Sequence, residues 1–134
     1  MVRKWFIPVA LALLASLPVM SQDQARIPSG ISLAFKAGNA AELSKYFNST
    51  VQIVLLDKED FYKKNIAETI FKDFFAEHRT KDFVILHHGG TTDSEYAICD
   101  LKTEKGDFRV YFLLKKVGTD LLIHQIRIES DSGK

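Results

Sequence analysis

Residues 95–116, EYAICDLKTEKGDFRVYFLLKK, decide the fold. Apolar and polar side chains alternate on both sides of Lys105-Gly106, which is the pattern of two antiparallel strands joined by a tight turn. A two-residue loop at Lys105-Gly106 sets Leu101 opposite Val110, Cys99 opposite Phe112 and Ala97 opposite Leu114. One face of the hairpin is then wholly apolar, and it consists of Ala97, Cys99, Leu101, Phe108, Val110, Phe112 and Leu114. We expect this inner face to pack against the helices of the domain.

The opposite face of the same hairpin mixes large apolar side chains with charged ones. Tyr96, Ile98, Tyr111 and Leu113 lie there among Asp100, Lys102, Arg109 and Lys115. A solvated sheet face normally holds fewer large apolar groups, so we consider this outer face a candidate pairing surface for a homodimer. The alternative is an ordinary, partly exposed face with scattered apolar residues.

The register of the last strand, over residues 121–129, depends on the turn before it. A two-residue loop at Gly118-Thr119 would place Gln125 and Arg127 on the apolar face. One more loop residue, or a bulge near Lys115-Lys116, exchanges the side chains between the faces. It brings Leu122, His124, Ile126 and Ile128 to the inner face and Ile123 to the outer face. Burying an aliphatic side chain stabilises a fold by about 1.5–3 kcal/mol, so we predict this second register.

Helical and strand patterns account for the chain before residue 95. Gly38 is typical of the residue that ends a helix, and Asn39 with Glu42 forms the capping box of a second helix. In chain order we expect helices over 27–37 and from 39, a strand over 51–56, a charged turn over 57–60, a short return strand at 61–62, a long helix over 63–77 and a strand over 83–88.

Four segments carry a resemblance to a known family. They are LSKYFN (43–48), LDKED (56–60), FRVYFLLKK (108–116) and QIRIE (125–129). They resemble an uncharacterised family of small exported bacterial proteins, a domain of unknown function with the nuclear transport factor 2-like, or cystatin-like, cone fold. The resemblance implies an α+β domain over 27–129, with helices packed on a curved, mostly antiparallel sheet. That fold hosts isomerases, dehydratases, transport adaptors and non-catalytic binders, so it implies no activity by itself.

The first 21 residues predict the compartment. Arg3 and Lys4 precede an uncharged, mostly apolar run from Trp5 to Met20, which is typical of a secretory signal peptide. The run is shorter than the about 20 apolar residues that a spanning helix needs. We expect cleavage after Ser21 and export to the periplasm or the exterior, with no membrane attachment afterwards. An uncleaved N-terminal anchor is the alternative.

Composition limits the function classes. Residues 1–21 hold two of the 18 basic residues and none of the 17 acidic ones, so the 113 remaining residues carry 16 basic and 17 acidic groups. Nucleic-acid binding needs a basic surplus, which this part of the chain lacks. Cys99 is the single cysteine, so the domain has no internal disulfide. Residues 22–26 and 130–134 are polar, and we expect a disordered lead and tail there.

The candidate pocket residues come from elements that point into the cone or reach its mouth. They are Tyr46, Asp57, Tyr62, Phe71, Phe112 and His124. In the predicted register His124 is the one titratable group on the inner sheet face, and no acid faces it. Proton abstraction needs a base and a donor for the oxyanion. We therefore expect binding of a small apolar ligand or a protein partner, with no catalytic residue assigned; the alternative is an isomerase or lyase that uses Tyr46, Asp57 or His124.

The outer face gives the second set of candidates. Tyr96, Ile98, Tyr111, Leu113 and Ile123 are the residues expected to pair in a homodimer, and a structural dimer without any ligand is a third hypothesis. We expect no cofactor and no metal ion. His87 and His88 are adjacent on a strand, so their side chains point to opposite faces and cannot chelate one ion together.

Overall fold

The computed structural model describes residues 26–131. The expected signal peptide, its cleavage site and residues 22–25 of the expected lead lie outside the described residues, as do residues 132–134 of the expected tail. Between residues 26 and 131 no helix is both long and apolar enough to cross a membrane.

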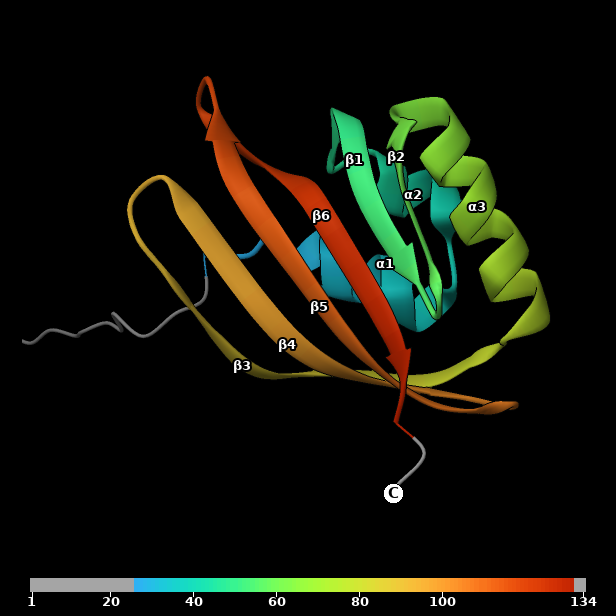
Figure 1. Cartoon of the computed structure of the whole chain (residues 1–134). Helices are drawn as coiled ribbons and strands as arrows, with labels where there is room; N and C mark the ends of the chain where they lie inside the picture. The colour runs from blue at the N-terminus through green and yellow to red at the C-terminus, as the bar shows by residue number, and fades with distance from the viewer. Residues whose placement is uncertain (1–25, 132–134) are drawn as a thin grey trace, which may run out of the picture.

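Six strands form one curved sheet that curls around the helices (Figure 1). The strands are β1 (Phe47–Leu55), β2 (Lys58–Lys63), β3 (Thr80–Gly90), β4 (Ser94–Thr103), β5 (Gly106–Val117) and β6 (Asp120–Ser130). Their spatial order is β2-β1-β6-β5-β4-β3, and each neighbouring pair is antiparallel except β1 with β6. The return strand β2 is longer than the two residues expected, because the turn before it is confined to Leu56 and Asp57.

The three helices of the described part of the chain lie on one face of the sheet, as the sequence predicts: α1 (Ser29–Ala37), α2 (Ala40–Ser44) and α3 (Lys64–Glu77). The corner between α1 and α2 forms as expected. Gly38 adopts the left-handed conformation with a φ of 64°, which favours glycine. The Asn39 side chain then accepts a hydrogen bond from the backbone N–H of Glu42 at 3.0 Å, which caps α2.

Phenylalanine rings fill the space between helices and sheet. The ring of Phe35 on α1 stacks on Phe83 of β3 with centroids 4.4 Å apart, and it meets Phe71 and Phe75 of α3 edge to face. The predicted inner face of β4 and β5 packs against this cluster. All seven of its residues are buried: Ala97, Cys99, Leu101, Phe108, Val110, Phe112 and Leu114.

The turn between β4 and β5 lies one residue earlier than predicted, at Glu104-Lys105. Thr103 pairs with Gly106, so Leu101 lies opposite Phe108, Cys99 opposite Val110 and Ala97 opposite Phe112. The Thr103 hydroxyl closes the turn, because it donates to the Gly106 carbonyl at 2.7 Å and accepts from the Lys105 N–H at 3.1 Å. Each pairing shifts by two residues, so the predicted pairs are wrong while the predicted faces are right.

The register of β6 is only partly as predicted. The two-residue loop at Gly118-Thr119 forms, and the pairing then shifts between Leu113 and Leu114, with His124 as the extra residue. Ile126 and Ile128 are buried on the inner face, as expected, but so is Ile123, which was expected outside. Leu122 and His124 are only partly buried, and Leu122 pairs with the exposed Lys115. A bulge at His124 is the physical reason, because it turns three isoleucines into the core.

Candidate functional site

The six residues expected to line one pocket do not meet in one place. Phe71 and Phe112 are 0% and 2% exposed and belong to the packed core. Tyr46 and Tyr62 are half-buried and pack against its edge, while Asp57 is exposed in the turn between β1 and β2. The Tyr46 ring lies on Gly30 of α1, where an added Cβ would collide with the Tyr46 hydroxyl. Phe71 and Phe112 therefore build the core and the two tyrosines cover its edge, whereas Asp57 lies apart from it.

His124 was expected inside the cone, and this placement is wrong. Its Nδ1 lies 3.0 Å from the backbone carbonyl oxygen of Leu122, so Nδ1 carries the proton and donates to that oxygen. Its side chain lines a surface hollow of about 250 Å³ over β1, β2, β5 and β6, together with Thr50, Gln52, Phe61, Leu113, Lys115 and Gln125. The hydrogen bond to the backbone fixes the ring, and no carboxylate lines the hollow.

The inner face carries a different titratable pair, His88 and Glu95. His88 Nδ1 lies 3.2 Å from Glu95 Oε2, and Glu95 is 5% exposed. The prediction that no acid faces the inner side is wrong. The sequence did hold a signal for Glu95, because the alternation that puts Ala97, Cys99 and Leu101 on the inner face also puts Glu95 there, at the start of the strand. His88 lies beside Glu95 on the inner face because the pairing of β3 with β4 shifts by one residue between Ile85 and His87. No local sequence pattern indicates this shift.

His87 and His88 do point to opposite faces, as predicted. His87 Nε2 lies 3.2 Å from the Tyr96 hydroxyl on the outer face, whereas His88 contacts Glu95 on the inner face. Among residues 26–131 no cluster of three or more His, Cys, Asp or Glu side chains is arranged to hold a metal ion.

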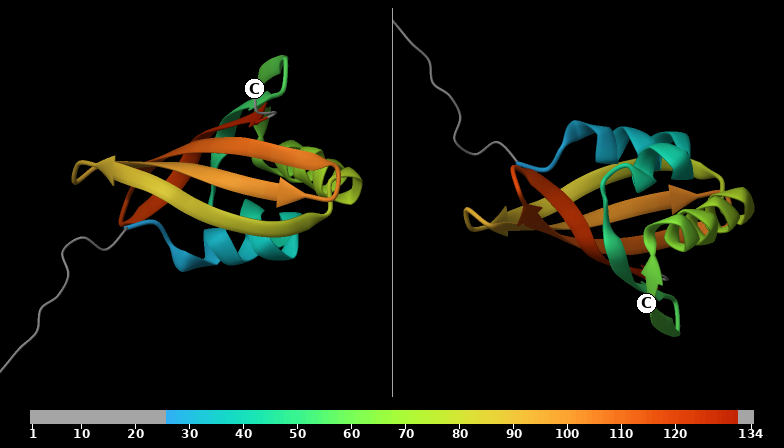
Figure 2. Two further views of the ribbon diagram at one scale, coloured as in Figure 1. Left: turned by 90° about the horizontal axis from the view of Figure 1, so that it is seen from below. Right: turned by 90° about the horizontal axis from the view of Figure 1, so that it is seen from above.

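The outer sheet face brings together most of the predicted pairing residues. One row of side chains runs across β4, β5, β6, β1 and β2, through Tyr96, Leu113, Gln125, Gln52 and Phe61. Tyr96 and Phe61 are 38% and 64% exposed. The left view of Figure 2 looks onto this side, with the strands in front and the helices behind them.

Two adjoining hollows lie along this row. The first, of about 230 Å³, is lined by Tyr96, Ala97, Ile98, Tyr111, Phe112, Leu113 and Gln125. The second is the hollow that His124 lines, and the two share Leu113 and Gln125. Four predicted pairing residues, Tyr96, Ile98, Tyr111 and Leu113, therefore surround one hollow. Ile123 is not among them, because it is fully buried in the core.

Polar groups on the outer face are paired with one another. Gln125 Nε2 donates to Gln52 Oε1 at 2.9 Å, and Gln52 Nε2 donates to Glu59 Oε2 at 2.7 Å. Arg109 contacts Asp100 at 3.2 Å and Asp131 at 3.3 Å, and Arg127 contacts Glu129 at 3.3 Å. Although desolvation lowers the pKa of Arg109, the hydrogen bond that it donates to Asp100 and the negative charge of Asp131 raise that pKa above its usual value.

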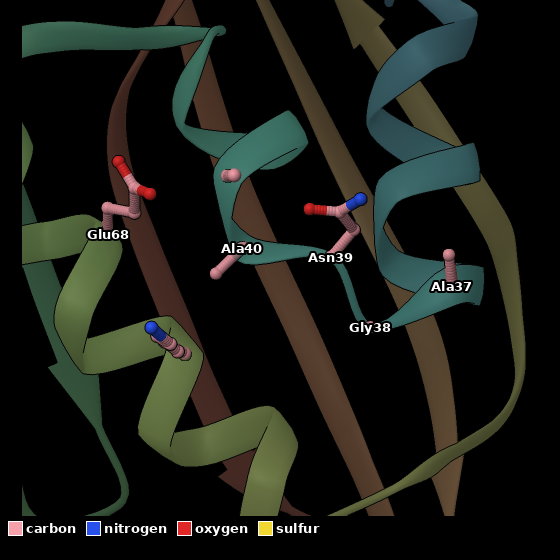
Figure 3. Close-up of a pocket in the computed structure, with 7 residues that line it drawn as sticks. Ala37, Gly38, Asn39, Ala40 and Glu68 are labelled. Carbon is pink, nitrogen blue, oxygen red and sulfur yellow. The ribbon is translucent and has the colours of Figure 1, made fainter.

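A third hollow, of about 350 Å³, lies between the α1–α2 corner and α3 (Figure 3). Two of its polar side chains, Asn39 and Glu68, already make hydrogen bonds within the fold. The Asn39 oxygen caps α2, and Glu68 Oε1 accepts a hydrogen bond from Ser44 at 3.1 Å. The outer sheet face is therefore the better candidate for the working surface.

Comparisons with known proteins agree with the fold. The family model for a domain of unknown function, DUF4783, matches residues 28–129. A DUF4783 family protein from Bacteroides uniformis is 36% identical; its crystal structure matches with a TM-score of 0.77, over 80% of this chain and 99% of that chain. A nuclear transport factor 2-like protein of unknown function from Shewanella baltica matches at 15% identity and a TM-score of 0.61, over 78% of this chain and 88% of that chain.

A domain of unknown function with a cystatin-like fold, from Nostoc punctiforme, matches at 8% identity and a TM-score of 0.63, over 77% of this chain and 72% of that chain. The predicted cone fold and the family resemblance are thus confirmed. A search of curated proteins finds no significant match.

Proposed function

We propose that this chain, which belongs to the DUF4783 family of domains of unknown function, is a non-catalytic binding module that works through its outer sheet face and docks there on a second copy of itself. One observation carries the proposal. Tyr96, Ile98, Tyr111 and Leu113 surround a single hollow on the sheet face opposite the described helices. Tyr96 is exposed and the other three are partly buried. Tyrosines and aliphatic side chains at the centre of a patch are typical of an interface core.

The charge pattern favours a second copy over a strongly charged partner. Arg109 and Arg127 flank the hollow, and each contacts carboxylates of the same face. The face therefore presents no large excess of either sign that would attract an acidic or a basic partner. A symmetric dimer brings one patch onto its own copy, which suits a surface with an apolar centre and a balanced rim.

The other roles considered for the chain have less support. A small apolar ligand in the cone would need the space that Phe71, Phe112 and their neighbours occupy. An isomerase or lyase that uses His124 would need the imidazole ring inside the cone. The ring lies outside the cone, hydrogen-bonded to the Leu122 carbonyl oxygen.

We also propose export, on the basis of residues 1–21 alone. In this proposal the chain is cleaved after Ser21 and works in the periplasm or the exterior without a membrane anchor. N-terminal sequencing of the protein from a cell envelope fraction tests it. A mature chain that begins at Gln22 supports cleavage, and an intact Met1 in the membrane fraction contradicts it.

Sedimentation velocity over a concentration series tests the dimer. The protein should shift from monomer to dimer as its concentration rises, and Leu113→Asp should stay monomeric throughout, because it puts a charge at the centre of the interface. Leu33→Asp is the matched control, since Leu33 is 63% exposed on α1, on the helical side. It should dimerise like the unaltered protein. An unaltered protein that is monomeric at the highest concentration would rule out the dimer.

A further inference from the structure

A cluster of hydrogen-bond acceptors lies at the turn between β3 and β4, and its residues line neither outer hollow. It consists of the Glu95 carboxylate and the backbone carbonyls of Thr91 and Thr92. His88 Nδ1 lies 3.2 Å from Glu95 Oε2, which leaves Oε1 for another partner. Glu95 is 5% exposed, and a carboxylate so far from water needs a cation beside it.

The partner is the guanidinium of Arg26. Its Nη1 and Nη2 donate to the Thr92 carbonyl at 3.3 and 3.2 Å, and Nη2 also donates to the Thr91 carbonyl. Nη2 lies 3.7 Å from Glu95 Oε1, which makes an ion pair. A planar guanidinium carries five donors in a fixed fork, so it can serve several acceptors at once, and an ammonium group cannot match that geometry.

The acceptors are held in place without Arg26. The Thr91 N–H donates to the Ser94 carbonyl at 2.8 Å, and the Lys116 N–H donates to the Asp93 carbonyl at 2.8 Å. Gly90 has a φ of 156°, and an added Cβ there would collide with the Ser94 carbonyl oxygen. Hydrogen bonds within the turn and from β5 therefore hold the hairpin turn in shape. Its carbonyls are oriented in this way before a guanidinium group binds to them.

We infer that Glu95 and the carbonyls of Thr91 and Thr92 form a guanidinium-binding site in which Arg26 is an exchangeable resident. Arg26 belongs to a separate segment, directly before the buried Ile27, and its side chain is 40% exposed. The arginine can leave while Ile27 stays in the core and the hairpin stays folded. An arginine side chain from a peptide then finds the same acceptors. This site does not depend on the proposed dimer.

Arg26→Ala empties the site and gives the test. Calorimetric titration of this variant with argininamide should show binding at least tenfold tighter than titration of the unaltered protein, whose own arginine competes. Lysinamide at the same ionic strength is the matched ligand, because it has the same charge without the fork. It should bind Arg26→Ala at least tenfold more weakly than argininamide does.

A second variant keeps the test decisive. Arg26→Ala combined with Glu95→Gln should lose the tight binding of argininamide, while its circular dichroism spectrum shows whether the fold persists. If that pair does not fold, the amide signals of Thr91 and Thr92 in Arg26→Ala give the readout, and they should shift with argininamide alone. Equal binding of the two ligands to Arg26→Ala, or equal binding of argininamide to Arg26→Ala and the unaltered protein, would overturn the inference.

Discussion

Leu113 lies directly opposite Gln125 across β5 and β6, one residue before the pairing shifts so that Leu114 lies opposite Ile123. This shift decides which side chains of β6 enter the core and which reach the outer face. It puts Gln125 beside Leu113 in both outer hollows, and it turns His124 away from the cone. The candidate surface therefore depends on a bulge of one residue.

The bulge predicts unequal effects of two neighbouring substitutions. Ile123→Ala should lower the free energy of unfolding by about 2–5 kcal/mol, because Ile123 is fully buried and the change leaves a cavity. Leu122→Ala should lower it by about 1 kcal/mol or less, since Leu122 is only partly buried. Urea unfolding of both variants checks this. A larger loss for Leu122→Ala would show that β6 has the opposite register.

The cap of α2 predicts a graded series at Asn39. Asn39→Ala should lower the free energy of unfolding by about 1 kcal/mol, because the Glu42 N–H loses its acceptor. Asn39→Asp keeps an oxygen there and should leave stability nearly unchanged, with Asn39→Gly between the two. Thermal unfolding of the three variants measures the order. Asn39→Ala as stable as Asn39→Asp would mean that the cap contributes nothing.

The single thiol should be inert in the folded protein. Burial, and then the charge of Asp100, raise the pKa of Cys99 from 9.0 to about 12. Iodoacetamide should therefore modify the native protein at pH 8 at least about a hundredfold more slowly than the protein in concentrated urea. Equal rates in the two states would contradict the buried position of Cys99.

The same thiol gives stability a pH dependence with a defined sign. Its pKa is higher in the folded chain than in the unfolded chain, so folding favours the protonated thiol. The contribution is complete below pH 9.0 and is lost as the pH rises from 9.0 towards about 12. Between pH 8 and pH 10 the free energy of unfolding, measured with urea, should thus fall more in the unaltered protein than in Cys99→Ala. If the free energy of unfolding fell equally with pH in the two proteins, the raised pKa of Cys99 would be contradicted.

Local signals were sufficient for the type and order of the elements and for the inner face of β4 and β5, but not for the bounds of β1, β2 and β3. Gly38, Asn39 and Glu42 mark the corner between helices, and strict alternation marks the buried residues from Ala97 to Leu114. Such signals depend on neighbours in the chain, which is why they can be interpreted from one sequence.

The pairing between strands was harder, because a shift of one residue is not recorded in either strand alone. The hydrogen bonds of Thr103 place the β4–β5 turn one residue earlier than predicted. The extra residue in β6 moves His124 off the inner face where it was expected, and the extra residue in β3 decides that His88 points inward. The core selects these shifts, since they bury Ile123 and bring His88 beside Glu95. Four of the five outer residues were still found, because β4 and β5 pair without a break from Ser94 to Thr103.

The most direct test of the outer face is a comparison of amide chemical shifts at low and high protein concentration. We predict that the signals of Tyr96, Ile98, Tyr111 and Leu113 move with concentration, while those of α1 and α2 stay in place. Signals that stay unchanged over the whole sheet, or that move only on the helices, would contradict a role for the outer face in self-association.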